Sequence, residues 1–189
     1  MSHDLLQDTR LTALLNHIDH DLAAAVRRQG CSCGSALHQA NYPRKPRGPQ
    51  WVDADESWTT RLSFCCGREG CRRRSTPPSV RFLGRKVYVA VVVTLGCVTR
   101  GRRLSAHVRV LEETLRVSPA TVRRWLAWWR QAFATTDLWV GLRGMFMPPP
   151  DEAKLPATLL AKFNGVAHEA LISFLKFISP VTTRTVHAM

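Results

Sequence analysis

The chain has 189 residues, of which 45% are hydrophobic, and its formal net charge is +13 at pH 7. This length can bury one core, or a small metal-stabilised module beside a compact helical domain. The longest apolar run, residues 87–98, is shorter than the ~20 residues that cross a bilayer, and the sequence starts without the basic segment of a signal peptide. The composition therefore argues against membrane-spanning and secreted proteins, and we expect a cytoplasmic one.

The positive charge is concentrated in one segment. Residues 61–130 contain sixteen of the 27 Lys and Arg residues and three of the 14 acidic ones, which leaves eleven of each elsewhere. Concentrated positive charge attracts polyanions, and nucleic acid is the commonest of these in the cytosol. A solvated basic surface that maintains solubility is the alternative explanation.

Residues 4–28 predict an amphipathic helix, which forms the first of four expected units (residues 1–30). Apolar residues recur at spacings of three and four, arginines occupy the last turn, and Gly30 follows as a stop. His17 and His20 lie on this helix, and we expect both to be exposed to solvent rather than bound to metal.

Residues 31–76 predict a zinc ribbon with a small β hairpin and no helix. Cys31 and Cys33 form one tight pair in CSCG, and Cys66 and Cys71 form a second in CGREGC. Two such pairs on separate turns can close a tetrahedron around Zn²⁺, which thiolates bind well. Since four thiolates leave no position for a water molecule, we expect one structural zinc ion per chain.

The remaining thiols and one histidine are weaker candidates for ligands. Strand alternation over residues 60–66 places Cys66 on the apolar face and Cys65 on the other, so Cys66 is preferred. Cys97 lies in an apolar run and is expected to be a buried small hydrophobe. His38 is the reserve ligand. Disulfides are the alternative for the pairs, which a reducing compartment disfavours.

Residues 79–135 predict a helix-turn-helix domain of three helices. The β-branched run 85–98 also fits a buried strand, but we expect it to form the first helix, followed by helices over 104–116 and 118–133. Ser118 suits the N-cap of the last helix and Pro119 its first position. Its inner stripe includes Trp125 and Trp129.

The outer face of that last helix is typical of a recognition helix. It has small residues at the start, which can enter a major groove, and arginines that can contact base edges or phosphates. The expected DNA-binding residues are Ser118, Thr121, Arg123, Arg124, Trp128 and Arg130, together with Arg72, Arg73 and Arg74 behind the second cysteine pair. An ordinary helical hairpin with a basic surface is the alternative.

Two weaker patterns also point to nucleic acid. Arg44, Lys45 and Arg47 lie in a proline-rich stretch and form a possible minor-groove arm, or simply an exposed linker. The tryptophan cluster of residues 125–129 could be a stacking platform for single strands, although two of its members fall on the inner stripe.

The remaining unit, residues 136–189, is predicted to be a helical tail with helices near 156–163 and 167–178. The expected fold class is therefore mainly α with a small zinc-ribbon β hairpin (α+β), built around a helix-turn-helix core.

The sequence contains the motifs HQANYPRKPRG and FCCGREGCRRRSTPPSVRFLGRKVY. Its features follow in the order CxCG, basic linker, CxxxxCRRR and predicted helix-turn-helix. The order is similar to the N-terminal DNA-binding region of bacterial insertion-sequence transposases, and the motifs more closely resemble short transposase-like bacterial proteins. The resemblance covers roughly residues 31–130. It implies that Cys31, Cys33, Cys66 and Cys71 are the zinc ligands and that the second helix of the helix-turn-helix contacts DNA.

The sequence departs from complete transposases in its catalytic residues. A DDE transposase needs three metal-binding carboxylates in a much longer domain, and only Asp137, Asp151, Glu152 and Glu169 follow the predicted helix-turn-helix. A relaxase needs an HxH pair, which the sequence lacks. We therefore predict no catalytic residues.

The combined expectation is a sequence-specific protein that binds double-stranded DNA and serves as a transposase-like accessory or regulator. It would be nucleoid-associated when bound to DNA, and a separate transposase or recombinase is a possible partner. Two alternatives stay open: a catalytic component of a transposition or nuclease system, and an RNA- or single-strand-binding protein.

Overall fold

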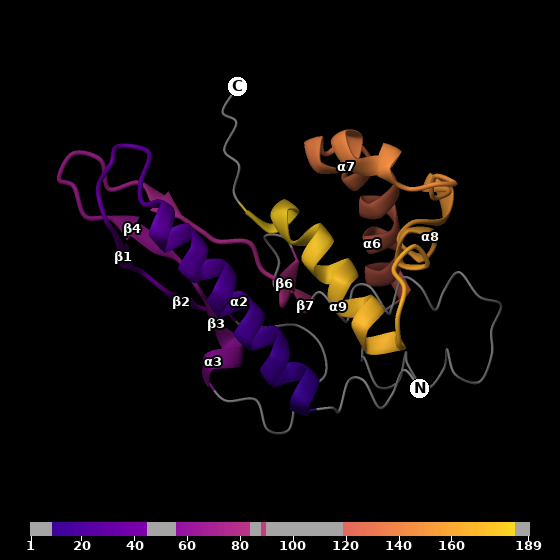
Figure 1. Cartoon of the computed structure of the whole chain (residues 1–189), viewed down its shortest axis with the longest axis horizontal. Helices are drawn as coiled ribbons and strands as arrows, with labels where there is room; N and C mark the ends of the chain where they lie inside the picture. The colour runs from indigo at the N-terminus through magenta and orange to yellow at the C-terminus, as the bar shows by residue number, and fades with distance from the viewer. Residues whose placement is uncertain (1–8, 45–55, 84–87, 90–118, 184–189) are drawn as a thin grey trace.

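The structure, a computed structural model, describes residues 9–44, 56–83, 88–89 and 119–183 (Figure 1). Its elements are, in chain order, α2 (Thr9–Gln29), β1 (Leu37–Gln39), β2 (Tyr42–Pro43), α3 (Glu56–Thr59), β3 (Thr60–Arg61), β4 (Phe64–Cys66), β5 (Arg74–Ser75), β6 (Phe82–Leu83), β7 (Tyr88–Val89), α6 (Pro119–Gln131), η1 (Phe133–Thr135), α7 (Asp137–Leu142), η2 (Arg143–Met145), η3 (Glu152–Lys154), α8 (Ala157–Leu160), α9 (Ala167–Ile178) and η4 (Ser179–Thr182). The fold is mainly helical with small antiparallel sheets, as the sequence predicted.

Three small antiparallel sheets are present in the described ranges. One has three strands in the order β1-β4-β5, and two others pair β2 with β3 and β6 with β7. In the first, Leu37 lies opposite Cys66 and Gln39 opposite Phe64. This register places one apolar face of the sheet against the end of α2, where Ala23, Leu37, Leu62, Phe64 and Cys66 form a small buried cluster.

The helix predicted at the N-terminus is confirmed from Thr9 onward. It ends at Gly30, whose φ of +74° is the left-handed conformation in which helices commonly terminate. Leu15 and Ile18 are buried, whereas His17 and His20 are exposed, as expected. The side of α2 that faces the protein thus follows the predicted apolar stripe except at Leu14, which is 42% exposed.

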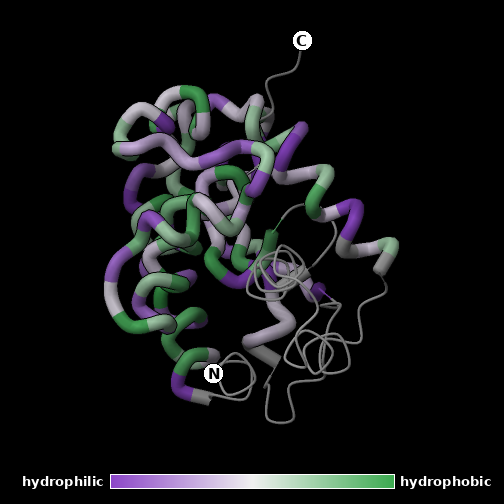
Figure 2. Tube along the Cα trace, turned by 90° about the vertical axis from the view of Figure 1, so that its right-hand side faces the viewer, coloured by the Kyte–Doolittle hydropathy of each residue, from purple (hydrophilic) through white to green (hydrophobic). Residues whose placement is uncertain are grey.

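A second, larger cluster contains a group of aromatic rings from the C-terminal helices. Trp129 packs edge-on against Phe133 with centroids 4.8 Å apart, Phe133 contacts Trp139 at 5.5 Å, and Trp129 contacts Phe174 of α9 at 5.8 Å. Figure 2 shows hydrophobic and hydrophilic residues alternating along the tube in this part of the chain. The inner stripe predicted for α6, including Trp125, is therefore confirmed.

Of the predicted helix-turn-helix, the structure describes only the last helix. Pro119 occupies the first position of α6, as predicted, while Ser118, residues 104–116 and most of residues 85–98 lie outside the described residues. Tyr88 and Val89 pair with β6 in a strand, so the helix expected for residues 85–98 is wrong at these two positions. Strand pairing satisfies their backbone groups and suits a β-branched sequence.

Two further helices differ from expectation. The single-turn helix α3 lies inside residues 31–76, where no helix was predicted. Helix α7 was also missed; the Thr136 hydroxyl caps it by accepting from the backbone N–H of Trp139 at 3.2 Å. In the tail, α9 spans residues 167–178 as predicted, and α8 is a shorter version of the helix predicted near 156–163.

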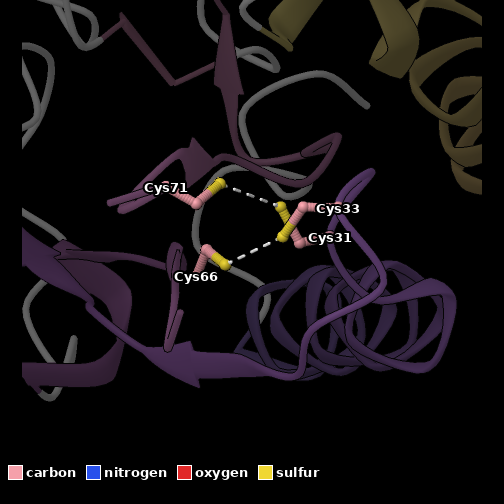
Figure 3. Close-up of side chains that lie close together, drawn as sticks. All are labelled: Cys31, Cys33, Cys66 and Cys71. Carbon is pink, nitrogen blue, oxygen red and sulfur yellow. Dashed lines mark hydrogen bonds between the residues drawn. The ribbon is translucent and has the colours of Figure 1, made fainter. Parts of the chain in front are cut away.

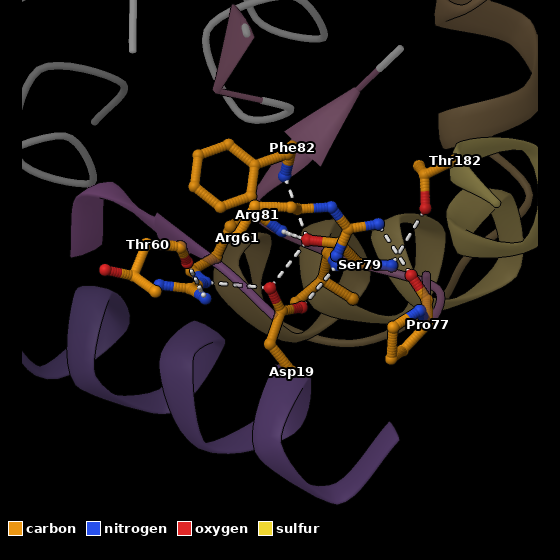
Figure 4. Close-up of polar contacts among 9 residues, drawn as sticks. Asp19, Thr60, Arg61, Pro77, Ser79, Arg81, Phe82 and Thr182 are labelled. Carbon is orange, nitrogen blue, oxygen red and sulfur yellow. Dashed lines mark hydrogen bonds and ion pairs between the residues drawn. The ribbon is translucent and has the colours of Figure 1, made fainter. Parts of the chain in front are cut away.

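A buried ion pair joins α2 to the segment that precedes β6 (Figure 4). The Nε of Arg81 donates to Oδ2 of Asp19 at 2.8 Å, and both side chains are 1% exposed. The same carboxylate accepts from the Ser79 hydroxyl at 2.6 Å and from the Val80 backbone at 2.7 Å, while Thr182 accepts from the Ser79 backbone at 2.9 Å. This network connects α2, the segment 79–82 and η4.

The two clusters lie at different places along α2. In Figure 1 the sheet β1-β4-β5 lies near the C-terminal end of α2, and α6 to α9 lie on the other side of the molecule, with β6 and β7 between them. The larger cluster takes residues from all four predicted units, with Trp58 as the buried contribution of residues 31–76. The unit boundaries themselves remain predictions. No helix in the described ranges is long and apolar enough to span a membrane.

Candidate metal centre

Four cysteines converge where two loops meet beside the small sheet (Figure 3). Cys31 and Cys33 lie in the first cysteine loop (residues 30–36), between α2 and β1. Cys66 ends β4, and Cys71 lies in the second cysteine loop (residues 67–73), which leads to β5. Their four sulfur atoms all lie within 4.8 Å of one another.

The sulfur positions match those of a tetrahedral metal site. Cys31 Sγ lies 3.8 Å from Cys71 Sγ, and Cys33 Sγ lies 3.5 Å from Cys66 Sγ. Four thiolates at a metal–sulfur distance of about 2.3 Å would be separated by about 3.8 Å. A disulfide needs a separation of about 2.05 Å, so these contacts are not disulfides. The four residues could therefore bind a metal ion.

Backbone hydrogen bonds fold the first cysteine loop into a compact turn. The N–H of Gly34 donates to Cys31 O at 2.8 Å, and the N–H of Cys31 donates to Ser35 O at 2.9 Å. Gly34 has a φ of +82°, which glycine adopts without the strain of a side chain. The turn brings the thiols of Cys31 and Cys33 to the same side of the loop, as Figure 3 shows.

The second cysteine loop is held in a similar way. Cys66 N–H donates to Arg73 O at 2.9 Å and closes the hairpin between β4 and β5, and Cys71 N–H donates to Arg68 O at 3.2 Å. The N–H of Arg68 also points at Cys66 Sγ, 3.4 Å away, and would stabilise a thiolate there. A hydrogen bond from Arg73 to the Ser32 hydroxyl links the two loops.

The thiols titrate as an interacting group. Hydrogen bonds from the Ser35 backbone and from the Cys66 thiol lower the pKa of Cys33 to about 6. The pKa of Cys31 is also lowered, chiefly by a backbone hydrogen bond from Cys33. For Cys66 the Arg68 N–H lowers the pKa, but burial and the neighbouring sulfurs outweigh it and raise it to about 12. The shifts favour the thiolate at Cys33 and the protonated thiol at Cys66, and a bound cation would favour the thiolate at all four cysteines.

Of the adjacent thiols Cys65 and Cys66, the structure places Cys66 with the other three sulfur atoms. Cys66 is fully buried among the sulfurs, whereas Cys65 lies on the other face of β4, where its thiol donates to Arg72 O at 3.4 Å. His38 lies opposite Cys65 in the sheet and is therefore also on the face away from the cluster. The cluster has four sulfur atoms without His38, so His38 is not required as a fourth ligand. Cys97 lies outside the described residues.

Three arginines predicted to bind DNA follow the cluster directly. Arg72, Arg73 and Arg74 are all exposed, and Arg72 has the unusual φ of +44°. Arg68 on the same loop is exposed as well. The chain therefore presents several positive charges to solvent directly beside the cysteine cluster.

The predicted residues of α6 lie elsewhere in the fold. Arg123, Arg124 and Arg130 are exposed, and Nη2 of Arg124 donates to the Thr121 hydroxyl at 3.0 Å. Trp128 is half-buried, with its ring 4.9 Å from that of Trp129, so it belongs partly to the core. Figure 1 shows α6 well separated from β4, so the structure does not bring these arginines together with those of the cysteine loop.

The structure also shows residues that the sequence analysis missed. Two of the basic residues in the segment 61–130, Arg61 and Arg81, are buried: Arg61 donates to Pro77 O at 2.6 Å, and Arg81 binds Asp19. They do not contribute to the surface charge. Tyr42 lies beside two arginines and was not predicted as a site residue. An aromatic residue within a basic stretch could have indicated it. Lys45 and Arg47 lie outside the described residues.

Comparison with protein-family models, with curated proteins and with solved structures found no match for this chain.

Proposed function

We propose that the chain is a sequence-specific DNA-binding protein, a transposase-like accessory or regulator stabilised by one structural zinc ion. The observation that carries the proposal is the second cysteine loop. Its exposed Arg68, Arg72 and Arg73, with Arg74 at the start of β5, are accompanied by a single acid, Glu69. The two cysteine loops have little core of their own, and a metal ion would hold them in shape. They would then present a fixed set of positive charges to phosphates.

Zinc is the ion that this ligand set favours. Closed sites of four thiolates are typical structural zinc sites, and all four positions of the tetrahedron are filled by protein sulfur. Iron is the main competitor for such a set. The site would stabilise the fold and would not activate a water molecule.

The zinc proposal predicts about one zinc ion per purified chain. Cys71→Ser should release the metal, because the hydroxyl is a poor ligand for a borderline-soft ion. Cys65→Ser is the matched control, since it makes the same change beside a ligand but on the opposite face of β4, and it should retain full metal content. Elemental analysis of both variants measures this. Absence of zinc from freshly reduced protein, or equal metal loss in both variants, would refute the assignment.

Helix α6 would supply the sequence preference. Its exposed arginines follow a short exposed start of the helix at Ala120, which suits entry into a major groove. The hydrogen bond to Thr121 holds the Arg124 guanidinium along the helix, which reduces the side-chain freedom lost on binding. The basic surface around the cysteine loops would contact phosphates and set the register.

Selection of bound sequences from a random duplex pool, at a stated salt concentration, tests the proposal. Arg124→Ala should cost about 1–3 kcal/mol on the selected site and relax the choice of base at one position. Arg143→Ala is the control: it removes the same charge from an exposed residue that pairs with Glu152 at 3.2 Å, and it should leave the base preference unchanged.

The same preparations separate the alternative functions. Stronger competition by RNA or single-stranded DNA than by duplex would indicate a single-strand binder, and divalent-metal-dependent cleavage or joining of DNA would indicate an enzyme. No enriched sequence, or an Arg124→Ala protein with unaltered affinity and preference, would overturn sequence-specific recognition by α6.

A further inference from the structure

Tyr42 has two arginine side chains beside its ring. The Cζ atom of Arg44 lies 4.7 Å from the ring centroid and that of Arg74 lies 5.3 Å from it. The two guanidinium carbons are therefore within about 10 Å of each other, which is about one Debye length at 0.1 M salt. Tyr42 and Arg44 are half-buried and Arg74 is exposed, so solvent reaches the group.

Strand pairing brings these residues together from distant parts of the sequence. Tyr42 lies in β2, and the N–H of Arg44 extends the pairing with β3 by donating to Thr59 O at 2.7 Å. Arg74 lies in β5, and its guanidinium reaches the Ala40 carbonyl at 3.4 Å. The arrangement thus depends on the backbone of two sheets and not on flexible surface side chains alone.

The positive charges around Tyr42 have no carboxylate partner among the residues that the structure describes. Neither Arg44 nor Arg74 takes part in the ion pairs found there, all of which involve other basic residues. A third arginine, Arg61, lies opposite Tyr42 in the β2–β3 register and is buried. Burial lowers the pKa of Arg61, the charge of Asp19 opposes this shift, and the charges of Arg81 and Arg44 add to it. Like charges gathered in this way repel one another, and a bound anion would relieve the repulsion.

We propose that Tyr42, Arg44 and Arg74, together the Tyr42 site, bind a single phosphate group of a nucleic-acid backbone. The inference rests on the proposed DNA-binding function and identifies one of its contacts. Each planar guanidinium offers several N–H donors in a geometry that matches phosphate oxygens. The ring orients both guanidiniums by cation–π contact. Its hydroxyl accepts from Nη2 of Arg44 at 3.4 Å, which leaves the hydroxyl hydrogen for a phosphate oxygen.

The position of the site in the sequence supports a backbone contact. Arg44 is the first of the three basic residues of the possible minor-groove arm, and Arg74 directly follows Arg72 and Arg73 of the second cysteine loop. A phosphate held at Tyr42 would therefore contact an arginine at the edge of each basic segment. Phosphate contacts fix register and carry no base information, so loss of the site should weaken all duplex sequences alike.

The slope of log affinity against log salt for a short duplex tests the inference. Each phosphate that the protein neutralises contributes roughly −0.9 to this slope. Arg44→Ala and Arg74→Ala should each reduce the slope by about 0.9, which makes the loss of affinity between 50 and 200 mM salt roughly 3.5-fold smaller. Because both arginines would hold the same phosphate, the double variant should show no more than the reduction of one single variant.

Tyrosine variants and a charge control complete the set. Tyr42→Ala should reduce the slope as the arginine variants do, because it removes the ring that orients both guanidiniums, whereas Tyr42→Phe keeps the ring and should keep most of the slope. Arg143→Ala removes one exposed charge outside the site and should change the slope little. Urea unfolding of each variant, with metal analysis, identifies any loss of affinity that comes from misfolding.

The outcomes separate the site from the proposed function. Duplex binding with unchanged slopes, or a double variant whose reduction is about twice that of a single one, would overturn the shared phosphate site and leave DNA binding intact. Titration with inorganic phosphate at constant ionic strength, followed by the Arg44 Nε–H resonance, probes the site without DNA. A shift that disappears in Arg74→Ala, in a protein that does not bind duplex, would support the anion site and refute the DNA-binding function. If the protein shows no duplex binding and no phosphate-induced shift, both the phosphate site and the DNA-binding function are refuted.

Discussion

Asp19 of α2 has a carboxylate that is enclosed on all sides by donors from other segments. It accepts from Arg81, from the Ser79 hydroxyl and from the Val80 backbone at 2.6 to 2.8 Å. The Ser79 hydroxyl accepts in turn from the backbone N–H groups of Arg81 and Phe82. Charges with this degree of burial stabilise a fold only when their hydrogen bonds are complete, and here the carboxylate has three.

Removal of this carboxylate should therefore strongly destabilise the protein. Asp19→Ala removes the carboxylate that the buried Arg81 Nε donates to, and breaking a buried ion pair in this way typically costs about 3–5 kcal/mol in free energy of unfolding. Asp21→Ala is the matched control on the same helix, because Asp21 is 70% exposed and pairs with the exposed His17. Its effect should stay within about 0.5 kcal/mol. Urea unfolding measures both, and equal small effects would contradict the structural role assigned to Asp19.

The sequence held a partial signal for Asp19, and none for its partner. Asp19 lies four residues after Leu15 and four before Ala23, so it falls on the apolar stripe of α2, where an acid is unexpected. Arg81 lies 62 residues further on, and its pairing depends on tertiary structure that periodicity does not encode. The contact of Arg44 and Arg74 with Tyr42 likewise depends on tertiary structure and could not be predicted from the sequence.

At the scale of elements, the second cysteine loop depends on one glycine conformation. Gly70 has a φ of +84°, and a Cβ at this position would meet no atom within 4 Å. Any cost of a side chain there comes from the backbone conformation alone. The loop must turn in this way to return Cys71 to the sulfurs and to continue into β5.

Gly70→Ala should destabilise the protein by about 1–2 kcal/mol, the usual penalty of a left-handed conformation for an L-residue with a side chain. Gly144→Ala is the control, since its Cβ also meets no neighbour and its φ is not positive. Denaturant unfolding of the metal-loaded proteins compares the two. A loss of metal affinity should accompany the change at Gly70 only, and identical behaviour of both variants would contradict the assigned constraint.

The elements that the sequence predicted best were those defined by local signals. The helix from Thr9, the helix over residues 167–178 and the start of α6 at Pro119 follow apolar periodicity, a stop at Gly30 or a proline at the first position. The paired cysteines were predictable because tight spacing and thiolate chemistry are local properties. The strand at Tyr88–Val89 was not, because a short apolar run fits either state until a partner strand is known.

At the scale of the whole molecule, α2 connects two hydrophobic clusters. Its 21 residues extend about 31 Å, which is enough for its first half to contribute Leu11, Leu15 and Ile18 to the aromatic cluster of α6 to α9. Its second half contributes Ala23 and Val26 to the cluster beside the cysteines. Only the second cluster includes potential metal ligands, and it is far the smaller of the two.

This division predicts that metal removal unfolds one part of the molecule. A chelator should disrupt the sheet β1-β4-β5 and both cysteine loops, because their small apolar cluster cannot offset the entropy of ordering the loops without metal binding. The aromatic cluster, with Trp129, Phe133, Trp139 and Phe174 all at most 1% exposed, should persist. Hydrogen exchange measures both, with protection lost over residues 31–39 and 64–75 and retained in α6 and α9.

The junction of the two parts decides how far the unfolding spreads. Asp19 and Arg81 connect the middle of α2 to the segment 79–82 and hence to η4, so the first half of α2 should stay protected while its last turns exchange freely. In the Asp19→Ala variant this boundary loses its buried ion pair, and chelation should then expose all of α2. Uniform loss of protection in the wild-type protein, including α6 and α9, would instead mean that the metal stabilises a single cooperative unit.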